Sequence, residues 1–190
     1  MSGAIFTDGA VFGCLAGLPG AGYAMVMASR TGDLLAACYG PLPADICPSQ
    51  TSADAEDYAL ASPATSAMAP LRIYTDRAGT VAAVGGSEAA ATRASSARAH
   101  LWSRYFAAFG GDADVQVLNT RAHATLRDVE AGRATHWGRR ANEHADRLAK
   151  LGAQAHGLTH TQVDEAAVLA SLAFQAARWA GEVGGPRTAG

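Results

Sequence analysis

The sequence contains two similar short stretches, AIFTDGA at residues 4–10 and RIYTDRA at residues 72–78. In each, an apolar run with β-branched and aromatic residues ends at Thr-Asp, which predicts two buried strands that end at Asp8 and Asp76. Burying a carboxylate is unfavourable unless another group pairs with it. The repeated pattern therefore predicts that the two aspartates lie side by side and share a partner.

The composition is that of a globular protein. Of 190 residues, 49% are hydrophobic and 17% are charged, so the chain is long and apolar enough to bury a core. The formal net charge of −2 excludes nucleic-acid binding through an overall positive charge, and a local basic patch would be needed. Three cysteines, Cys14, Cys38 and Cys47, form no C-x-x-C pair and are expected to be reduced thiols.

The chain has no charged residue between Gly9 and Ser29, a span long enough for a membrane helix. Its middle, GCLAGLPGAG at residues 13–22, contains four glycines and a proline, which favours a hairpin instead. Asp8 lies where a secretory signal would carry basic residues. We therefore expect a soluble intracellular protein, cytoplasmic or nuclear, without membrane association.

The hydrophobic pattern predicts an order of strands and helices. Three strands at hairpin spacing predict an antiparallel meander, and two further strands follow later in the chain. Helices are expected between them, the first capped by Thr51 or Ser52 and interrupted by Pro63. The strands are predicted over 4–8, 22–29, 32–40, 71–75 and 114–120, and the helices over 51–68, 78–109 (in two pieces) and 142–155, with a polar loop and short turn over 121–141.

We expect one domain over residues 1–157 and an appendage over 158–190. The appendage is predicted as an amphipathic helix that Thr161 can cap, followed by a disordered tail. The apolar side of this helix carries Leu169, Phe174 and Trp179. Packing on the domain is the favoured interpretation of this side, and contact with a partner is the alternative.

Four carboxylates, Asp8, Glu56, Asp76 and Asp146, occupy the ends of predicted strands or the first turns of predicted helices. Like charges this close cannot all stay ionised unless a cation neutralises them. Oxygen ligands without cysteine or paired histidine favour Mg²⁺ or Mn²⁺ over zinc. Two such ions can activate water on one side of a phosphodiester and stabilise the leaving oxygen on the other.

Each acid alone also has an ordinary structural interpretation. Asp54, Glu56 and Asp57 can stabilise a helix start through its dipole, and Asp146 can pair with Lys150 one turn later. The ordered set, each acid in a suitable element, is what favours a metal site.

From about Ala4 to Ala155, this ordered set resembles the type 1 ribonuclease H family. The motif IFTDGA resembles the family's first strand, and LPGAGYAMVM is similar to the glycine-rich segment leading into the second. QTSADAEDYAL resembles the helix start that carries the second acid, Glu56, and IYTDRAGTV the strand that carries the third, Asp76. NEHADRLAKLGA resembles the closing helix, with Asn142 and the fourth acid, Asp146.

The resemblance implies an α/β fold with a five-stranded mixed sheet, three antiparallel strands and then two parallel additions, flanked by helices. It implies an endoribonuclease that cleaves the RNA strand of RNA–DNA hybrids with two Mg²⁺ or Mn²⁺ ions held by Asp8, Glu56, Asp76 and Asp146. Gly9, Ser52 and Asn142 fall at motif positions expected to contact substrate. A family histidine after the fifth strand points to His123 in TRAH, and His136 is the alternative.

The chain departs from the family pattern at three positions: Ala53 replaces a polar amide, Arg77 replaces a small polar residue, and Pro63 interrupts a regular helix. These departures motivate an alternative function, a catalytically weak or inactive nucleic-acid-binding module with the same fold. A third hypothesis, ranked last, is another nuclease of the same broad fold, such as an exonuclease or a transposase-like protein.

Residues 121–150 contain seven basic and four acidic residues, a local charge of +3. Such a cluster beside acidic residues suits a phosphate backbone, and we expect Arg121, Arg139 and Arg140 to bind substrate, with Trp137 stacked beside a sugar. A solvated charged loop is the plainer alternative. Aromatic residues at helical spacing, Trp102, Tyr105 and Phe106, are expected in the core. We expect a monomer, free-standing or formerly part of a retroelement polyprotein, because the chain begins almost directly at the first strand.

Overall fold

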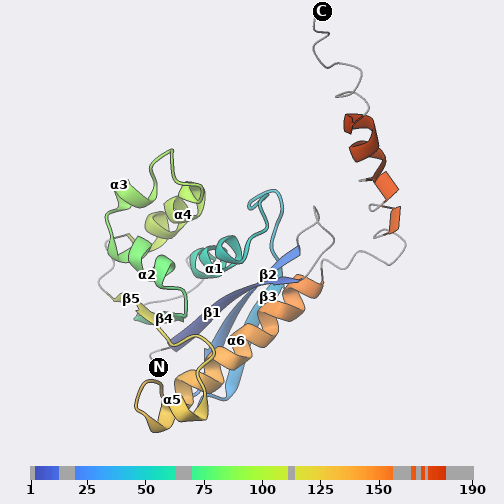
Figure 1. The fold of residues 1–190 in the computed structure, drawn as a ribbon. Coiled ribbons are helices and arrows are strands. Elements are labelled where there is room, and N and C mark those ends of the chain that lie inside the picture. Colours follow the sequence, from blue (N-terminus) through green and yellow to red (C-terminus); the bar gives the residue numbers. More distant parts are fainter. Residues whose placement is uncertain are drawn as a thin grey trace, which may run out of the picture.

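The computed structural model describes residues 3–12, 20–62, 70–110 and 114–155, together with 164–165, 168–169 and 171–178 near the C-terminus. Five strands form one sheet in the order β3-β2-β1-β4-β5 (Figure 1). The strands are β1 Gly3–Phe12, β2 Gly20–Ala28, β3 Leu34–Pro41, β4 Leu71–Thr75 and β5 Val115–Asn119. The first three pair antiparallel, whereas β4 is parallel to β1 and β5 is parallel to β4. The predicted mixed sheet is confirmed.

Six helices connect or follow these strands within the described segments before residue 156: α1 Ser52–Ala61, α2 Ala78–Gly85, α3 Glu88–Ala91, α4 Ala99–Phe109, α5 Leu126–Glu130 and α6 His136–Gln154. The prediction of two helical pieces over 78–109 is wrong, because three are present. The predicted loop over 121–141 is also wrong in part. Thr125 and Thr135 cap new helix starts there, by accepting from the backbone N–H groups of Asp128 and Gly138.

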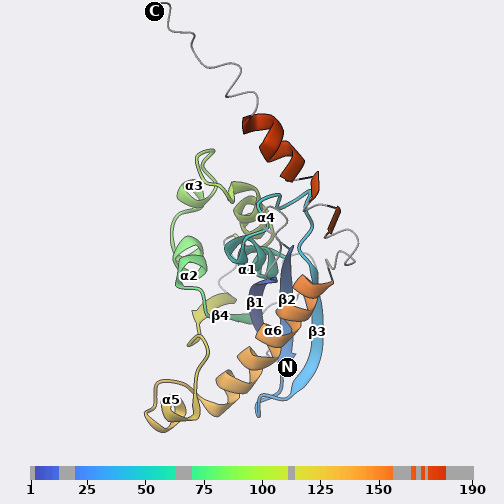
Figure 2. The same cartoon turned by 45° about the vertical axis from the view of Figure 1, so that its right-hand side comes forward.

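Helix α6 covers one face of the sheet, and α1 and α4 cover the other (Figures 1 and 2). On the α6 side, Phe6 and Val26 pack against a face of α6 that is mostly alanine. This face lies very close to the sheet: a Cβ atom at Gly152 would come within 2.8 Å of the carbonyl carbon of Gly40. Small residues on both elements therefore fix the position of α6 and of the polar residues that it carries.

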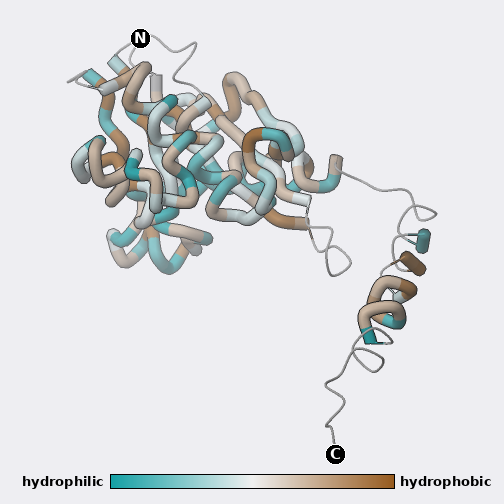
Figure 3. The backbone as a smooth tube through the Cα atoms, turned by 90° about the horizontal axis from the view of Figure 1, so that it is seen from above, coloured by the Kyte–Doolittle hydropathy of each residue, from teal (hydrophilic) through white to brown (hydrophobic). Residues whose placement is uncertain are grey.

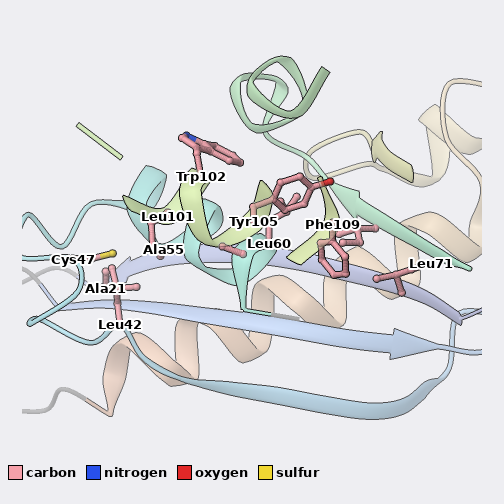
Figure 4. Close-up of a cluster of buried hydrophobic side chains, with 12 residues drawn as sticks. Ala21, Leu42, Cys47, Ala55, Leu60, Leu71, Leu101, Trp102, Tyr105 and Phe109 are labelled. Carbon is pink, nitrogen blue, oxygen red and sulfur yellow. The ribbon is translucent and has the colours of Figure 1, made fainter. Parts of the chain in front are cut away.

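The opposite face is filled by a cluster of large apolar side chains from α1, α4 and the sheet, drawn in Figure 4. Trp102 and Tyr105 are both 4% exposed, and Phe106 packs against this cluster. The prediction that these aromatic residues belong to the core is confirmed.

Trp137 is partly buried and packs against the core between α6 and the sheet. Its ring meets Phe6 edge-on at a centroid distance of 4.9 Å and Tyr74 at 5.1 Å. Helix α6 begins at His136 rather than at Asn142 and carries this ring against the strands, and the predicted stacking of Trp137 beside a sugar stays a prediction.

Residues 171–178 are helical and include both hydrophobic and hydrophilic residues (Figure 3). Leu169, Leu172 and Phe174 are 66%, 55% and 72% exposed. For these described residues, the expected packing on the domain is wrong, because their apolar side chains remain in solvent. The boundary near residue 157 stays a prediction, and the predictions for Cys14, Pro63, Thr161 and Trp179 lie outside the described residues.

Among the described helices, none combines the length and the apolar character that crossing a membrane requires. Cys38 is exposed and Cys47 is buried, and both are free thiols.

Candidate metal centre

Three carboxylates that are far apart in the sequence converge at the end of β4. Because β1 and β4 are parallel neighbours and Thr7 pairs with Thr75, the next residue of each, Asp8 and Asp76, lies at the same edge. Glu56 reaches this point from α1. One carboxylate oxygen from each of Asp8, Glu56 and Asp76 lies within 4.8 Å of the other two.

A glycine allows α1 to approach β1 closely enough for this arrangement. A Cβ atom at Gly9 would overlap the backbone nitrogen of Glu56 and lie 2.8 Å from the Cβ of Ala55. Ser52, at the start of α1, donates from its hydroxyl to the carbonyl of Gly9 at 3.0 Å. Gly9 and Ser52, expected to contact substrate, thus join α1 to β1 beside the carboxylates, and their role toward substrate stays a prediction.

Two of the three carboxylates have strongly raised pKa values. Burial, followed by the charge of Asp76, raises the pKa of Asp8 from 3.8 to about 7, although the backbone N–H of Gly9 opposes this at 2.7 Å from Oδ1. Burial, followed by the charges of Asp76 and Asp8, raises the pKa of Glu56 from 4.5 to about 8. Each group therefore makes the ionisation of its neighbours less favourable.

These residues fit a hard divalent cation. The Oε2 atom of Glu56 is buried and has no hydrogen-bond partner in the described part of the chain. All three side chains offer oxygen, the donor that Mg²⁺ and Mn²⁺ prefer. A cation would offset both the burial of the charged forms and the repulsion that raise the pKa values of Asp8 and Glu56.

Asn142 supports this site from α6. Its side-chain nitrogen donates to Oδ2 of Asp76 at 3.3 Å, and the residue is 5% exposed. Its Oδ1 is buried without a hydrogen-bond partner among the described residues. The structure therefore places Asn142 in contact with a candidate ligand, whereas the predicted contact with substrate stays a prediction.

Asp146 lies outside the group of three. Its Oδ2 accepts from Lys150 at 2.8 Å, the intrahelical alternative noted from the sequence, and its side chain is 25% exposed. Its charge is still close enough to raise the pKa of Asp8. Convergence thus holds for three of the four acids, and a ligand role for Asp146 stays a prediction.

The two candidate histidines are both exposed and are not members of the carboxylate group. His123 lies between β5 and α5 with a positive φ of 45°. His136 is the first residue of α6 rather than a loop residue, because Thr135 caps the helix there. His123 therefore remains the candidate on a loop after β5.

The arginines predicted to bind substrate each have a carboxylate partner. Arg121 pairs with Asp128 at 3.0 Å, and Arg139 with Glu143 at 3.2 Å. Arg140 pairs with Asp33 at 2.7 Å, which ties α6 to the turn between β2 and β3. Contacts of Arg121, Arg139 and Arg140 with a phosphate backbone stay predictions.

Sequence reasoning missed a buried charged cluster next to the carboxylates. Asp57, which follows Glu56, is 1% exposed and pairs with Arg77, which follows Asp76, at 2.7 Å. The ordinary interpretation of Asp57 from the sequence is a contribution to the helix dipole. Its spacing from the apolar Leu60 and Ala61 was the available signal, because a carboxylate on the buried face of a helix requires a partner.

No protein-family model matches the chain, and no curated protein matches its sequence. Solved structures do match. The RNase H domain of PFV has a TM-score of 0.63 and 17% identity, covering 80% of this chain and 94% of that domain. The protease–reverse transcriptase of prototype foamy virus has a TM-score of 0.65 and 17% identity, covering 83% of this chain. This chain spans only 21% of the length of that longer protein.

RNase H1 from the archaeon Halobacterium salinarum is similar with a TM-score of 0.51 and 17% identity, covering 80% of this chain and 97% of that one. Identities this low establish the fold rather than the activity. Both the strand order and the positions of the helices agree with it. The chain therefore has a ribonuclease H-like fold.

Proposed function

We propose that this chain is a divalent-metal-dependent endoribonuclease that hydrolyses the RNA strand of RNA–DNA hybrids. The observation that carries the proposal is the convergence of Asp8, Glu56 and Asp76 to within 4.8 Å on a ribonuclease H-like fold. A cluster of buried, mutually repelling carboxylates is unfavourable for folding, and a bound cation would compensate this cost by neutralising their charges.

In this proposal Asp8, Glu56 and Asp76 hold the metal, and Asp146 joins them by leaving Lys150. A pair of bound Mg²⁺ or Mn²⁺ ions would supply an activated water and a counter-charge for the leaving oxygen. The backbone N–H of Gly9 and the side chain of Asn142 orient the carboxylates of Asp8 and Asp76. His123, on an exposed loop after β5, is the group available for proton transfer or product release.

Structural neighbours support the choice of substrate. A foamy viral protease–reverse transcriptase and LC11-RNase H1 have each been solved in complex with an RNA/DNA hybrid, and a foamy viral protease–reverse transcriptase also with double-stranded DNA. By analogy, the hybrid is the proposed partner of this chain, which would act as a monomer. Descent from a retroelement polyprotein is part of the same proposal.

Cleavage of an end-labelled RNA–DNA hybrid in Mg²⁺ or Mn²⁺ tests the proposal. The wild type should cut the RNA strand and leave single-stranded RNA and duplex DNA intact. Asp76→Asn should abolish cleavage, whereas Asp45→Asn, which removes an exposed carboxylate, should not alter it. Equal rates for Asp76→Asn and the wild type would contradict the assignment, and cutting of duplex DNA would favour a different nuclease.

The Asp146–Lys150 hydrogen bond favours a second candidate, a binding module with weak or no activity. In that case the wild type binds the hybrid without cutting it. Lys150→Gln then separates the two candidates, because it frees Asp146 for the metal. Cleavage that appears or rises in this variant identifies the pair as a restraint on activity, and a variant that still binds without cutting supports the binding module.

A further inference from the structure

The residues that follow two of the candidate metal ligands are joined to each other. Asp57 comes directly after Glu56, and Arg77 comes directly after Asp76. The Oδ1 atom of Asp57 accepts from Nη1 of Arg77 at 2.7 Å and from the hydroxyl of Thr80 at 2.6 Å. The same arginine nitrogen also lies 3.2 Å from the Thr80 hydroxyl. These three side chains form a closed triangle beside the carboxylate group.

The second oxygen of Asp57 is also engaged. Its Oδ2 lies 2.6 Å from Nε of Arg98, the N-cap residue of α4. Arg98 further pairs with Asp54 at 3.4 Å. The carboxylate of Asp57, 1% exposed, is therefore anchored by the hydrogen bonds to its Oδ1, whereas its Oδ2 faces Arg98 as an ion pair without a hydrogen bond among the described residues.

This cluster fixes two backbone segments that the metal site needs side by side. Glu56 belongs to α1, whereas Asp76 lies between β4 and α2. Their negative charges repel each other, so wherever both are ionised and no cation is bound, this repulsion favours opening of the site. A planar guanidinium bound to both Asp57 and Thr80 resists such opening.

We propose that Arg77, Asp57 and Thr80 form a positioning cluster that holds Glu56 and Asp76 at ligand spacing before a metal ion arrives. The inference rests on the proposed metal-dependent function, and Arg77 acts through its neighbours. Ligands that are already in place bind a cation more tightly, because no reorganisation opposes binding.

The positioning role and a simple charge effect predict opposite results. As a positive charge near the carboxylates, Arg77 would weaken cation binding, so removing it would strengthen binding. As a positioning residue, it strengthens cation binding, so removing it weakens binding. Arg77, Arg98 and Asp57 line a cavity of about 440 Å³ together with small residues such as Gly79 and Ala82, which leaves room for other side chains at position 77.

The test uses the full chain without nucleic acid and titrates Mn²⁺ by isothermal calorimetry. We expect Arg77→Lys and Arg77→Gln to weaken Mn²⁺ binding roughly tenfold or more, the usual effect of losing a residue behind a ligand. Arg98→Gln is the matched control, since it removes the other partner of Asp57 but does not adjoin a candidate ligand. Arg98→Gln should change the Mn²⁺ affinity less than about twofold, even if it lowers the melting temperature as much as the Arg77 variants do.

Three results would each overturn the proposal. They are an unchanged Mn²⁺ affinity of Arg77→Lys, tighter Mn²⁺ binding by Arg77→Gln, and no saturable Mn²⁺ binding by the wild type. On the hybrid substrate, the arginine variants should need more Mn²⁺ for half-maximal rate while the KM for hybrid is unchanged, and a raised KM for hybrid alone would count against positioning. A wild type that binds Mn²⁺ as expected but cleaves no hybrid would refute the proposed function and leave this inference standing for a metal site.

Discussion

Without a divalent cation, the protein should lose stability as the pH rises from about 4 to about 8. In the folded state the pKa of Asp8 is raised from 3.8 to about 7 and that of Glu56 from 4.5 to about 8. Between the unfolded and folded pKa values, the folded chain therefore binds more protons than the unfolded chain. Stability then falls with rising pH, and the loss is complete above the folded pKa values.

The variant Asp8→Asn gives this effect a magnitude. Raising the pKa of Asp8 from 3.8 to about 7 corresponds to about 4 kcal/mol at about 1.4 kcal/mol per pKa unit. Asparagine keeps the side-chain oxygen that accepts from the N–H of Gly9, so the variant loses the charge and little else. At pH 8 in EDTA it should be more stable than the wild type by about 4 kcal/mol, or roughly 10 °C in melting temperature. At low pH, where Asp8 is protonated, the two should be nearly equal.

Urea unfolding followed by circular dichroism, at several pH values in EDTA and in Mg²⁺, measures the difference. Asp45→Asn, at an exposed carboxylate, serves as the control and should follow the wild type. Mg²⁺ should stabilise the wild type more than Asp8→Asn at pH 8, since only the wild type has the full ligand set. Parallel pH profiles for wild type and Asp8→Asn in EDTA would refute the reasoning, because folding would then not raise the pKa of Asp8.

Three substitutions test the structure around the site by urea unfolding. Gly9→Ala should lower the free energy of unfolding by several kcal/mol, as overpacking does, because the added Cβ would overlap the backbone of Glu56. The same change should abolish the stabilisation by Mg²⁺. A loss of less than about 1 kcal/mol would contradict the close approach of α1 to β1. Asp57→Asn should lower the free energy of unfolding by about 3 kcal/mol or more, because two guanidinium groups lose their shared counter-charge. Asp33→Asn, which breaks an exposed pair, should have a much smaller effect. Trp137→Ala should lower the free energy of unfolding by about 3 kcal/mol or more, since two aromatic rings contact its indole. No change in this free energy would contradict the packing of the indole against the strands.

The position of a candidate acid could be predicted where a strong local sequence pattern determines the strand or helix that carries it. The strand over 71–75 was predicted with its observed bounds, because an apolar run ends there at Thr-Asp. Thr51 was one of the two predicted caps of α1, and it forms a reciprocal capping box with Asp54. These two features bring Asp76 and Glu56 to the site, and both follow from local chemistry.

Features that depend on tertiary contacts could not be predicted. Asp146 has the same spacing to Lys150 whether or not it binds a metal, so the sequence cannot decide between the two partners. Arg77 was noted as a departure from the family pattern, but its partner Asp57 lies twenty residues earlier in another element. The helix α5 was missed although Thr125 and Asp128 have capping-box spacing, because the surrounding residues are polar and show no clear period.

Crystals of the chain grown with Mn²⁺ and measured at the manganese absorption edge would test the central claim most directly. The account predicts an anomalous peak from a manganese ion coordinated by carboxylate oxygens of Asp8, Glu56 and Asp76. The peak should be far weaker in crystals of Asp76→Asn. A map without a peak between these three side chains, or with manganese bound elsewhere on the domain, would contradict it.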